Sequence, residues 1–347
     1  MGTLFTKLAP TLIILMVISA NQRLAAQNSC SEILDQAELL FEQGIIEEIP
    51  EILSGCIKDG FSPEEKVRAQ KLLILTYIFD NNIPEAEAVL FDFLKDNPEY
   101  VAAPDDPAEF VLLLSGFRTI PYLSVGMFTG GNLSAANMVE HYGPYNPGNG
   151  KGSFAMNAPG FQIGAAVNAF LTDWMEINAE ALFEINSFTY SNVQYGFAEV
   201  NLKETHQRFE FPVTATFYQI HNEWMPYFRA GMSYGILTSA SGNFRRSYIN
   251  NDVSGPLESL DVDITGRRRT GFVNLIAGAG IKYKIPRGHV YFDLRYYYGL
   301  SQKVIPEGRW QHDEVFQFFT SDSNFFLDHL AFSLGYRYSF FRPVKRR

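Results

Sequence analysis

The most regular feature of the chain is a strict alternation of apolar and polar residues near its C-terminus. One parity is apolar and ends in aromatic residues: Leu330, Phe332, Leu334, Tyr336, Tyr338 and Phe340. Successive side chains of a β-strand point to opposite faces, so this segment predicts a strand with one apolar and one small or charged face. Repeated in long strands, the pattern is typical of a transmembrane β-barrel.

The same period of two recurs from Thr119 onward and predicts eight strands. Their expected ranges are 120–131, 158–171, 175–190, 205–219, 225–240, 267–284, 289–303 and 328–341. The connections alternate between tight turns, as at 173–174, 221–223 and 286–288, and long gaps at 132–157, 191–204, 241–266 and 304–327. Short periplasmic turns and long outer loops are expected of an outer-membrane barrel. We therefore predict an eight-stranded antiparallel transmembrane β-barrel over residues 119–341, with both ends on the periplasmic side.

Charged residues of these strands fall on the inward parity. The expected lumen network consists of Glu176, Glu180, Glu184, Arg208, Glu210, Arg229, Lys282, Asp293, Arg295 and Arg337. An Arg or Lys facing lipid at the midplane would cost about 2–4 kcal/mol, which explains the inward placement. Buried charges must be paired, and eight strands leave room only for side chains or one small ligand. A salt-bridged plug is the favoured interpretation, and a proton or ligand path is the alternative.

The N-terminal third has helical periodicity and follows an expected signal peptide at residues 1–26. Lys7, the apolar run Leu8–Ile18 and the small residues before Gln27 give the three parts of that signal. Helices are expected over 45–57, 66–79, 84–94 and 107–116, with Ser62-Pro63-Glu64-Glu65 as a helix start. Cys30 and Cys56 bracket the first helix pair, and an oxidising periplasm allows a disulfide between them.

The helical segments also resemble one another. Residues 40–45 correspond to residues 78–83 at a spacing of 38. The second pair resembles a tetratricopeptide unit through Ala69, Tyr77, Asn82, Ala86, Leu90 and Pro98. This resemblance implies a small helical bundle over residues 27–118 that binds a peptide or protein segment. The fold class expected is thus α + β, with a small periplasmic TPR-like bundle followed by the barrel.

Charge divides the chain in the same place. Residues 27–118 carry 19 Asp and Glu against six Lys and Arg, a balance of −13, whereas residues 119–347 carry 19 acids and 20 bases. Such an acidic domain excludes nucleic acid as a partner, since nucleic-acid binding requires a basic surface. It is also repelled by an anionic membrane face.

The last predicted strand carries a motif that resembles a known signal. Ser333, Gly335, Tyr338 and Phe340 resemble the insertion signal of outer-membrane proteins, a polar residue and a glycine before two aromatic residues. The barrel resembles the OmpX/PorT-like outer-membrane β-barrel group over about 220 residues. The chain continues past the motif into a basic tail at 342–347, which is expected in the periplasm, and the helical extension is a further departure from that group.

The sequence offers only weak candidates for catalytic, metal-binding or phosphate-binding residues. His206 and His329, with Asp328 and Ser323, could imitate a hydrolase cluster, but solvated rim residues are the simpler interpretation. Asp261 and Asp263 alone fall short of a calcium site. Five arginines flank the third outer loop and could contact the phosphates of lipopolysaccharide: Arg245, Arg246, Arg267, Arg268 and Arg269. No catalytic residue, metal ligand or cofactor is assigned.

The resulting prediction is a non-enzymatic outer-membrane barrel that anchors an acidic periplasmic protein-binding domain in a cell-envelope assembly. The alternative is a barrel enzyme, or a binder of a small ligand or lipopolysaccharide, acting at the lumen or outer rim. The expected partners are outer-membrane lipid and lipopolysaccharide, the barrel-insertion machinery, and a periplasmic or envelope protein.

Overall fold

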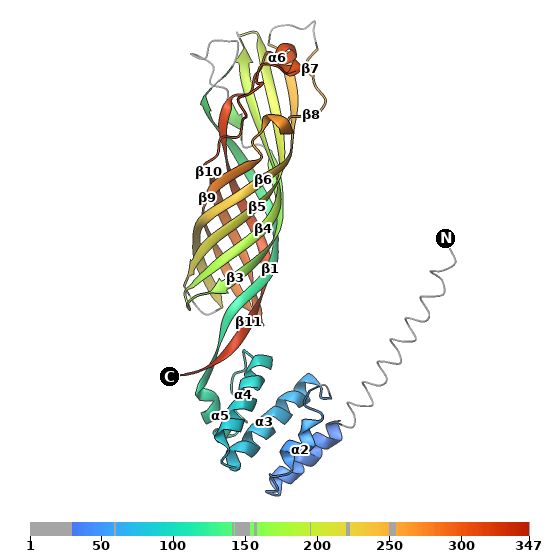
Figure 1. Cartoon of the computed structure of the whole chain (residues 1–347), viewed down its shortest axis with the longest axis vertical. Coiled ribbons are helices and arrows are strands. Elements are labelled where there is room, and N and C mark those ends of the chain that lie inside the picture. The colour runs from blue at the N-terminus through green and yellow to red at the C-terminus, as the bar shows by residue number, and fades with distance from the viewer. Residues whose placement is uncertain are drawn as a thin grey trace, which may run out of the picture. The chain divides into compact units, whose positions relative to one another are not determined.

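The computed structural model describes residues 30–58, 60–140, 142, 153–155, 158–194, 196–219, 223–249 and 255–346. The expected signal peptide therefore lies outside the described residues. The chain divides into two compact units, one comprising residues 1–120 with 341–347 and the other residues 121–340 (Figure 1). Among the described helices, none has both the length and the apolar character needed to cross a membrane.

The first unit is helical, as predicted. Residues 30–42 are helical and are followed by α2 (Ile49–Ser54), α3 (Pro63–Phe79), α4 (Ile83–Asp96) and α5 (Ala108–Ser115). Ser62 caps α3 in a reciprocal capping box with Glu65, which satisfies two backbone N–H groups at the helix start. Helix α2 begins at Ile49, later than the predicted residue 45, because Pro50 is tolerated only in a first turn.

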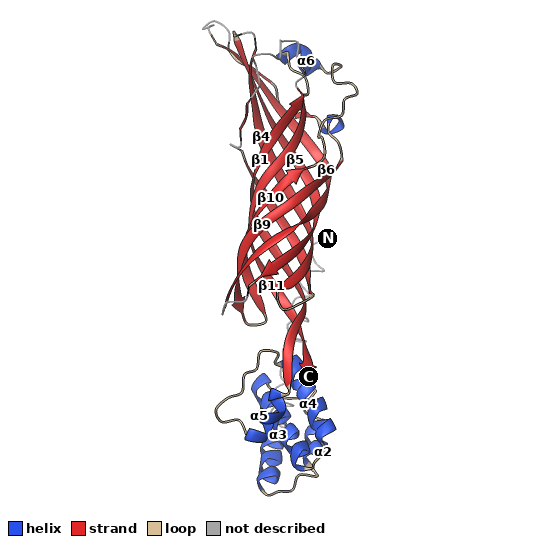
Figure 2. Ribbon diagram, turned by 90° about the vertical axis from the view of Figure 1, so that its left-hand side faces the viewer, coloured by secondary structure: helices blue, strands red, loops and turns tan. Residues whose placement is uncertain are grey.

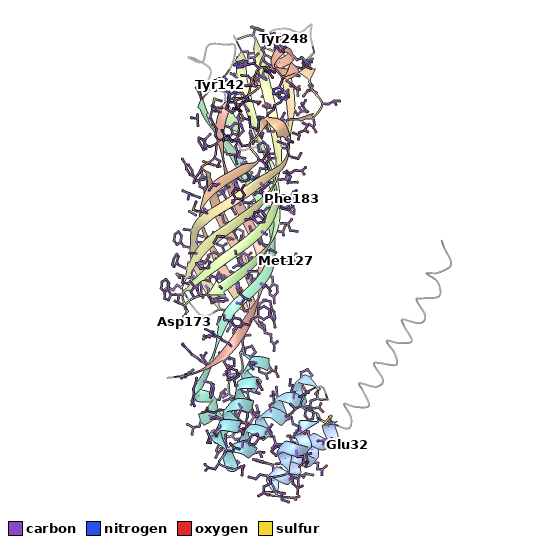
Figure 3. The ribbon with its side chains drawn as sticks, viewed as in Figure 1. Glu32, Met127, Tyr142, Asp173, Phe183 and Tyr248 are labelled. Carbon is purple, nitrogen blue, oxygen red and sulfur yellow. A yellow bond between two sulfur atoms is a disulfide. The ribbon has the colours of Figure 1, made fainter. Side chains whose placement is uncertain are left out.

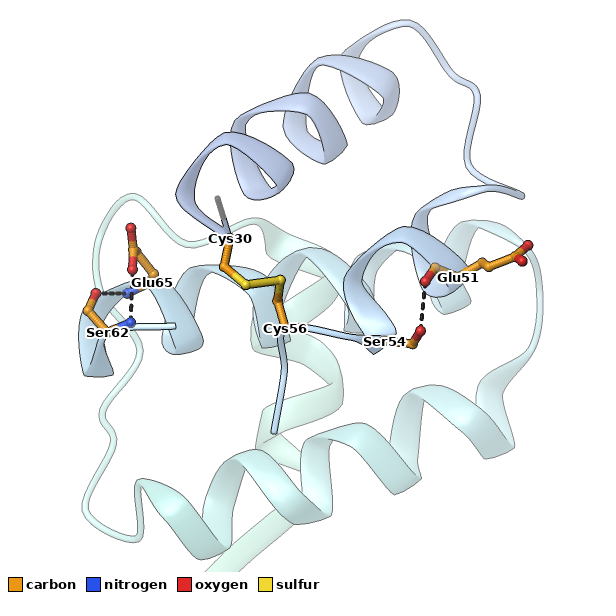
Figure 4. Close-up of a disulfide and its surroundings, with 6 residues drawn as sticks. All are labelled: Cys30, Glu51, Ser54, Cys56, Ser62 and Glu65. Atoms are coloured by element: carbon orange, nitrogen blue, oxygen red, sulfur yellow. Dashed lines mark hydrogen bonds between the residues drawn. A yellow bond between two sulfur atoms is a disulfide. The ribbon is translucent and has the colours of Figure 1, made fainter. Parts of the chain in front are cut away.

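A disulfide and two apolar clusters hold this unit together. Cys30 and Cys56 are bonded with their Cα atoms 5.7 Å apart, which confirms the predicted bridge (Figure 4). One cluster forms around Leu34, Leu53 and Ala69, and the other around Leu90, Phe93 and Phe110. Both clusters use residues of α3, which is therefore the central helix of the unit (Figure 2).

Eight long strands of the described chain close into a barrel. They are β1 (Phe117–Glu140), β3 (Pro159–Phe170), β4 (Met175–Gln194), β5 (Ala198–Tyr218), β6 (Trp224–Tyr248), β9 (Gly271–Ile285), β10 (Gly288–Gly299) and β11 (Asn324–Lys345). Sequential neighbours pair antiparallel, and β11 lies beside β1 to close the ring. The end with the tight β3–β4 and β9–β10 connections is called here the turn end, and the opposite end is called the loop end.

Short elements decorate the loop end. Strand β2 (Ser153–Ala155) pairs with β4, and strands β7 (Leu257–Glu258) and β8 (Val262–Asp263) pair with β6. A 3-10 turn η1 (Thr265–Arg267) and helix α6 (Asp313–Phe318) lie in the connections after β8 and β10. Figure 1 shows α6 at this end of the barrel.

Five strands are longer than predicted. Strands β4 and β5 approach each other to Gln194 and Ala198, and β6 reaches Tyr248, so most of the expected loops at 191–204 and 241–248 are sheet. Strand β1 likewise continues to Glu140. At the other end, β11 runs to Lys345, so the tail predicted at 342–347 is mostly strand.

Contacts within the helical unit involve the end of that strand. The backbone N–H of Arg346 donates to the Gly116 carbonyl at 2.7 Å, and Lys345 pairs with Glu87 at 2.5 Å. The prediction of a separate basic tail is therefore wrong for the described residues 342–346. The motif residues Tyr338 and Phe340 do not end the strand, because the backbone continues to find partners beyond them.

The strands change character along their length. On β5 the outward residues Phe209, Phe211 and Val213 are exposed and apolar, whereas Glu199, Asn201 and Lys203, of the same parity, are polar. The inward residues change in the opposite sense, from Arg208 and Glu210 to Ala198, Val200 and Leu202. We call the part on the turn side of Arg208 the lower barrel and the part beyond it the extension.

A β-bulge marks the change. Arg208 pairs with Leu237 and Gln207 with Ser239, so β6 carries one extra residue, Thr238. The bulge moves the inward parity of β6 from odd to even residues: Leu237 is buried below it, and Ala240 and Phe244 are buried above it. Because the predicted strands assume a single inward parity, the sequence pattern does not indicate that β6 continues beyond the bulge.

Candidate functional site

The barrel interior contains all ten charged residues predicted for it, and each is almost completely buried. Nearest the turn end, Glu176 accepts a hydrogen bond from the Lys282 ammonium at 2.7 Å and lies 3.4 Å from Arg337. The polar neighbours Asn168 and Asn178 contact this group as well, since Asn168 donates to Glu176 and Arg337 donates to Asn178. This layer therefore joins β3, β4, β9 and β11.

The middle of the lumen is organised around Glu180. Its carboxylate binds Arg295, and it also accepts from Arg229 at 3.0 Å and lies 3.4 Å from Arg337. Asp293 supplies the second carboxylate, 2.6 Å from Arg295 and 3.2 Å from Arg229. Three arginines and two carboxylates thus cross-link four strands from within.

The third layer lies at the level of the bulge. Arg208 binds Glu184, lies 3.6 Å from Glu210, and donates to His329 Nδ1 at 3.1 Å. Glu184, Glu210 and His329 bring possible metal-ligand atoms within 4.8 Å of one another. The Arg208 guanidinium already contacts all three residues and supplies the positive charge that a cation would bring, so we assign this group to the ion-pair network.

The part of the interior that the described residues line is filled rather than open. Three cavities near the loop end have volumes of about 10–20 Å³, which is room for a single water each. Large buried side chains, including Tyr291, Tyr297 and Phe272, occupy the spaces between the charged layers. These observations favour the plug over the proton or ligand path.

The rim histidines are buried, not solvated as expected. His206 lies 3.0 Å from the Glu204 carboxylate, and His329 stacks on Tyr297 with ring centroids 4.1 Å apart. Asp328 instead accepts from the Tyr296 hydroxyl at 2.7 Å and from the Gly299 N–H at 2.8 Å. Ser323 accepts from the Tyr142 N–H. The four residues of the hydrolase alternative are engaged in separate contacts, because the continuation of β5 places His206 inside the extension.

The five loop arginines divide into two groups, which corrects their prediction as one lipopolysaccharide contact. Arg268 is buried and pairs with Glu204 at 2.5 Å and with Asp322 at 2.9 Å. Arg246 also points inward and is 7% exposed. Arg267 is partly buried against Glu314 at 2.6 Å, whereas Arg245 is exposed beside Glu258 and Arg269 is exposed.

Sequence analysis missed the residues that pair with the inward arginines. Glu204 and Asp322 fall in the expected loops 191–204 and 304–327, yet they line the interior of the extension. Glu204 has the same inward parity as Arg208 and Glu210, so extending the predicted β5 strand by one residue finds it. Asp322 lies outside the regular strands and carries no such signal.

The two loop aspartates act locally. Asp263 accepts from the Thr265 N–H at 2.8 Å, and Asp261 accepts from the Asn243 amide at 3.4 Å. Their carboxylates thus hold the turn that contains η1. Of the insertion motif, Ser333 points inward and accepts from Gln162 at 2.7 Å, and a Cβ on Gly335 would lie 2.6 Å from Tyr291 Cζ. Gly335 is therefore required for the close approach of that ring.

The helical unit differs because most of its charge faces water. Four of its basic side chains pair with acids: Lys66 with Asp96, Arg68 with Glu38, Lys71 with Asp106, and Lys95 with Asp92. Burial alone would raise the pKa of Asp106, but hydrogen bonds from Lys71, Tyr100 and the Ala103 N–H hold that pKa below its usual value. The excess acids include the exposed Glu42, Glu47, Glu48 and Glu51, which we call the acidic surface.

A closed eight-stranded ring with apolar outward residues and a charged interior defines a membrane β-barrel. The family of outer membrane protein beta-barrel domains matches residues 116–303, and the chain belongs to this family. The barrel is thus an outer-membrane protein of a Gram-negative bacterium. None of the curated proteins matches the chain.

Several solved structures are similar to part of this chain. Neisserial surface protein A is 12% identical with a TM-score of 0.31, covering 62% of this chain and 97% of its own. Ail of Yersinia pestis is 11% identical with a TM-score of 0.27, covering 63% and 100%. OprG of Pseudomonas aeruginosa is 10% identical with a TM-score of 0.30, covering 65% and 99%.

Proposed function

We propose that this protein is a non-enzymatic outer-membrane anchor whose helical domain, residues 27–118, faces the periplasm and binds another envelope protein. The observation that carries the proposal is the contrast in charge. The barrel pairs its interior charges with one another, whereas residues 27–118 carry an excess of 13 negative charges. The basic residues at 342–347 offset only part of this excess, with Lys345 pairing with Glu87.

Two further features support this assignment. The repeated helix pairs around α3 resemble a tetratricopeptide unit, and such units present surfaces for peptides or protein segments. The disulfide between Cys30 and Cys56 is typical of an oxidising compartment such as the periplasm. The partner that fits is a protein with a basic or amphipathic segment, whose association rate falls as salt rises.

Site-specific crosslinking in cells tests the proposal. A photoreactive residue at Glu48, on the acidic surface, should capture one predominant envelope protein, and the same residue at the lipid-facing position Val213 should not. With the photoreactive residue kept at position 48, neutralising Glu42, Glu47 and Glu51 to Gln should abolish the adduct. The matched control Asp35→Asn, Glu38→Gln and Asp92→Asn removes the same charge from acids that already have basic partners and should leave the adduct intact.

A genetic comparison tests the same proposal independently. A strain carrying the barrel without residues 31–116 should insert the barrel and still show the phenotype of a strain lacking the whole gene. If the truncated barrel restores every phenotype, the helical domain is dispensable and the recruiting role is wrong.

Lipopolysaccharide contact remains a proposal for Arg269 only. Arg269 is exposed at the base of the extension and is available to phosphate, whereas Arg268 is buried and Arg245 lies beside Arg246, further from the lower barrel. The barrel would also engage the insertion machinery through its last strand, with the motif Ser333, Gly335, Tyr338 and Phe340.

A further inference from the structure

Arg246 is a buried cation with no carboxylate partner among the residues that the structure describes. Its side chain points into the extension, is 7% exposed, and has a buried Nε that meets no acceptor among the described residues. No described carboxylate forms an ion pair with it. Arg268 and Arg208 differ, because Arg268 has two carboxylate partners and Arg208 has Glu184. An unpaired buried charge is costly, so its retention here calls for an explanation.

Three aromatic rings surround the guanidinium instead. Its Cζ lies 4.6 Å from the ring centroid of Phe319, 5.2 Å from that of Tyr248 and 6.0 Å from that of Phe197. The rings of Phe197 and Tyr248 stack on each other with an interplanar angle of 12°. All three residues remain between 38% and 46% exposed, so they form an aromatic platform at the surface.

The backbone is held in an unusual conformation to complete this platform. Phe319 has a φ of 50°, in the left-handed region that bulky residues rarely adopt. The amide of Gln194 fixes it by donating to the carbonyls of Phe318 and Phe319, at 3.3 and 2.8 Å. Strained residues of this kind are concentrated at ligand sites.

The position argues against membrane lipid as the ligand. Arg246 lies eight residues beyond the bulge at Thr238, which is about 20 Å further from the lower barrel for a tilted strand. Figure 3 shows Tyr248 at the far loop end, away from Phe183 in the lower barrel. Lipid phosphates lie near the start of the extension and do not reach the platform.

The shape argues against an extended peptide. Peptides bind through grooves or by adding a strand to a free sheet edge. Here β6 is paired on one side with β5 and on the other with β7, at Arg246 itself, and the cavities nearby hold about one water. A sugar ring needs neither a groove nor an edge, because its C–H face stacks flat on an aromatic ring.

We propose that Arg246, Phe197, Tyr248 and Phe319 form a binding site for an acidic saccharide, whose ring stacks on the aromatic platform while its carboxylate pairs with the guanidinium. The site is independent of the helical domain and of its proposed partner. It assigns the loop end of the barrel a recognition role in addition to anchoring.

Binding of a hyaluronan tetrasaccharide to the full-length protein in nanodiscs tests the site, with neutral chitotetraose and hexaglutamate as comparison ligands. The acidic saccharide should bind at least tenfold more tightly than either comparison ligand. Arg246→Met should lower its affinity roughly tenfold or more, as expected for loss of a hydrogen bond to a charged group. The matched control is Arg245→Met, which removes the same charge from the adjacent, outward residue and should change the affinity less than twofold.

A second variant keeps the test decisive if Arg246→Met fails to fold. Phe319→Asn removes one ring, and Asn tolerates the left-handed conformation, so the backbone should persist while affinity falls. The proposal is overturned if the neutral sugar or the peptide binds equally well, if the two arginine variants weaken binding equally, or if the acidic saccharide does not bind.

Discussion

The lower barrel and the extension are built from the same strands, but they distribute apolar and polar side chains differently between the inner and outer faces. In the lower barrel, apolar side chains such as Phe209 and Val213 face outward and the interior is a lattice of ion pairs around Glu180. In the extension, the apolar cluster of Leu202, Phe244 and Phe318 packs inside next to the buried pair of Arg268 and Glu204, and polar residues such as Lys203 face outward. A single strand therefore has lipid on its outer side in the lower barrel and water on its outer side in the extension.

The lengths fit this division. The outward apolar residues of β5 run from Phe209 to Phe217, about 20 Å along the membrane normal for a tilted strand, close to the roughly 25 Å apolar band of such barrels. A lipid-facing surface must be apolar, so the charges have only the interior available. Once lipid ends, ordinary hydrophobic burial applies and the apolar residues turn inward.

Removal of a lumen carboxylate should have the largest effect. Glu180→Ala leaves Arg229, Arg295 and Arg337 without their common partner and should destabilise the folded barrel by about 4 kcal/mol. Glu199→Ala, on the outer face of the extension, should change stability by less than about 0.5 kcal/mol. Urea unfolding of the detergent-solubilised protein measures both, and equal effects would contradict the distinction between the two interiors.

An aromatic pair makes the complementary comparison. Phe244→Ala opens a cavity in the core of the extension and should cost about 3 kcal/mol. Phe209→Ala faces lipid, which refills the vacated space, so its cost should be below about 1 kcal/mol. The relative size of the two decreases in unfolding free energy is the test. A larger decrease for Phe209→Ala than for Phe244→Ala would mean that the interior of the extension is not a packed apolar core.

Adding a charge on the outer face tests the position of the boundary. Val213→Arg places a guanidinium in the apolar band and should cost about 2 to 3 kcal/mol. Thr205→Arg has the same outward parity on the same strand but lies in the extension, so it should be nearly neutral. Unfolding in lipid vesicles gives both values, and a comparable penalty at residue 205 would move lipid contact into the extension.

Sequence reasoning succeeded where one physical rule governs a whole strand. Lipid forces a strict alternation, so all ten lumen charges and the lower parts of the strands followed from parity. It failed in the extension for two reasons. The bulge at Thr238 shifts the inward parity of β6. On β5, Leu202 faces inward and Lys203 faces outward, whereas the prediction assumed that apolar residues face outward along the whole strand.

The candidate binding site shows the same limit. Arg246 was singled out by its charge, but the paired Arg245 has the same sequence signal and the opposite orientation. Phe319 comes from a connection 73 residues away along the chain, and only the folded structure brings its ring to the guanidinium. The disulfide was predictable because an antiparallel helix pair brings its two ends together.

The helical unit should show the smallest effect, since its ion pairs lie near water. Asp106→Asn removes the partner of Lys71 and should destabilise the unit by about 1 kcal/mol. The pKa of Asp106 is lowered in the folded state, so this stabilisation is present above the usual carboxyl pKa and is lost as pH falls through the lowered value. Hydrogen exchange of the full-length protein should show helical amides losing protection on acidification, and less so in the variant. An unchanged pH response in the variant would contradict this assignment.

The change from lipid contact to water contact on the outer face of β5 at Arg208 can be measured directly by spin-label accessibility. The two native cysteines form a disulfide, so single cysteines can be introduced at outward positions 199, 201, 203, 205 and 207, and at 209, 211, 213, 215 and 217. In lipid vesicles, labels at the second set should be accessible to oxygen and protected from a water-soluble nickel reagent, with the opposite result at the first set. The account predicts that the change falls within two residues of Arg208. Lipid contact that continues to residue 199, or water contact at residue 213, would contradict it.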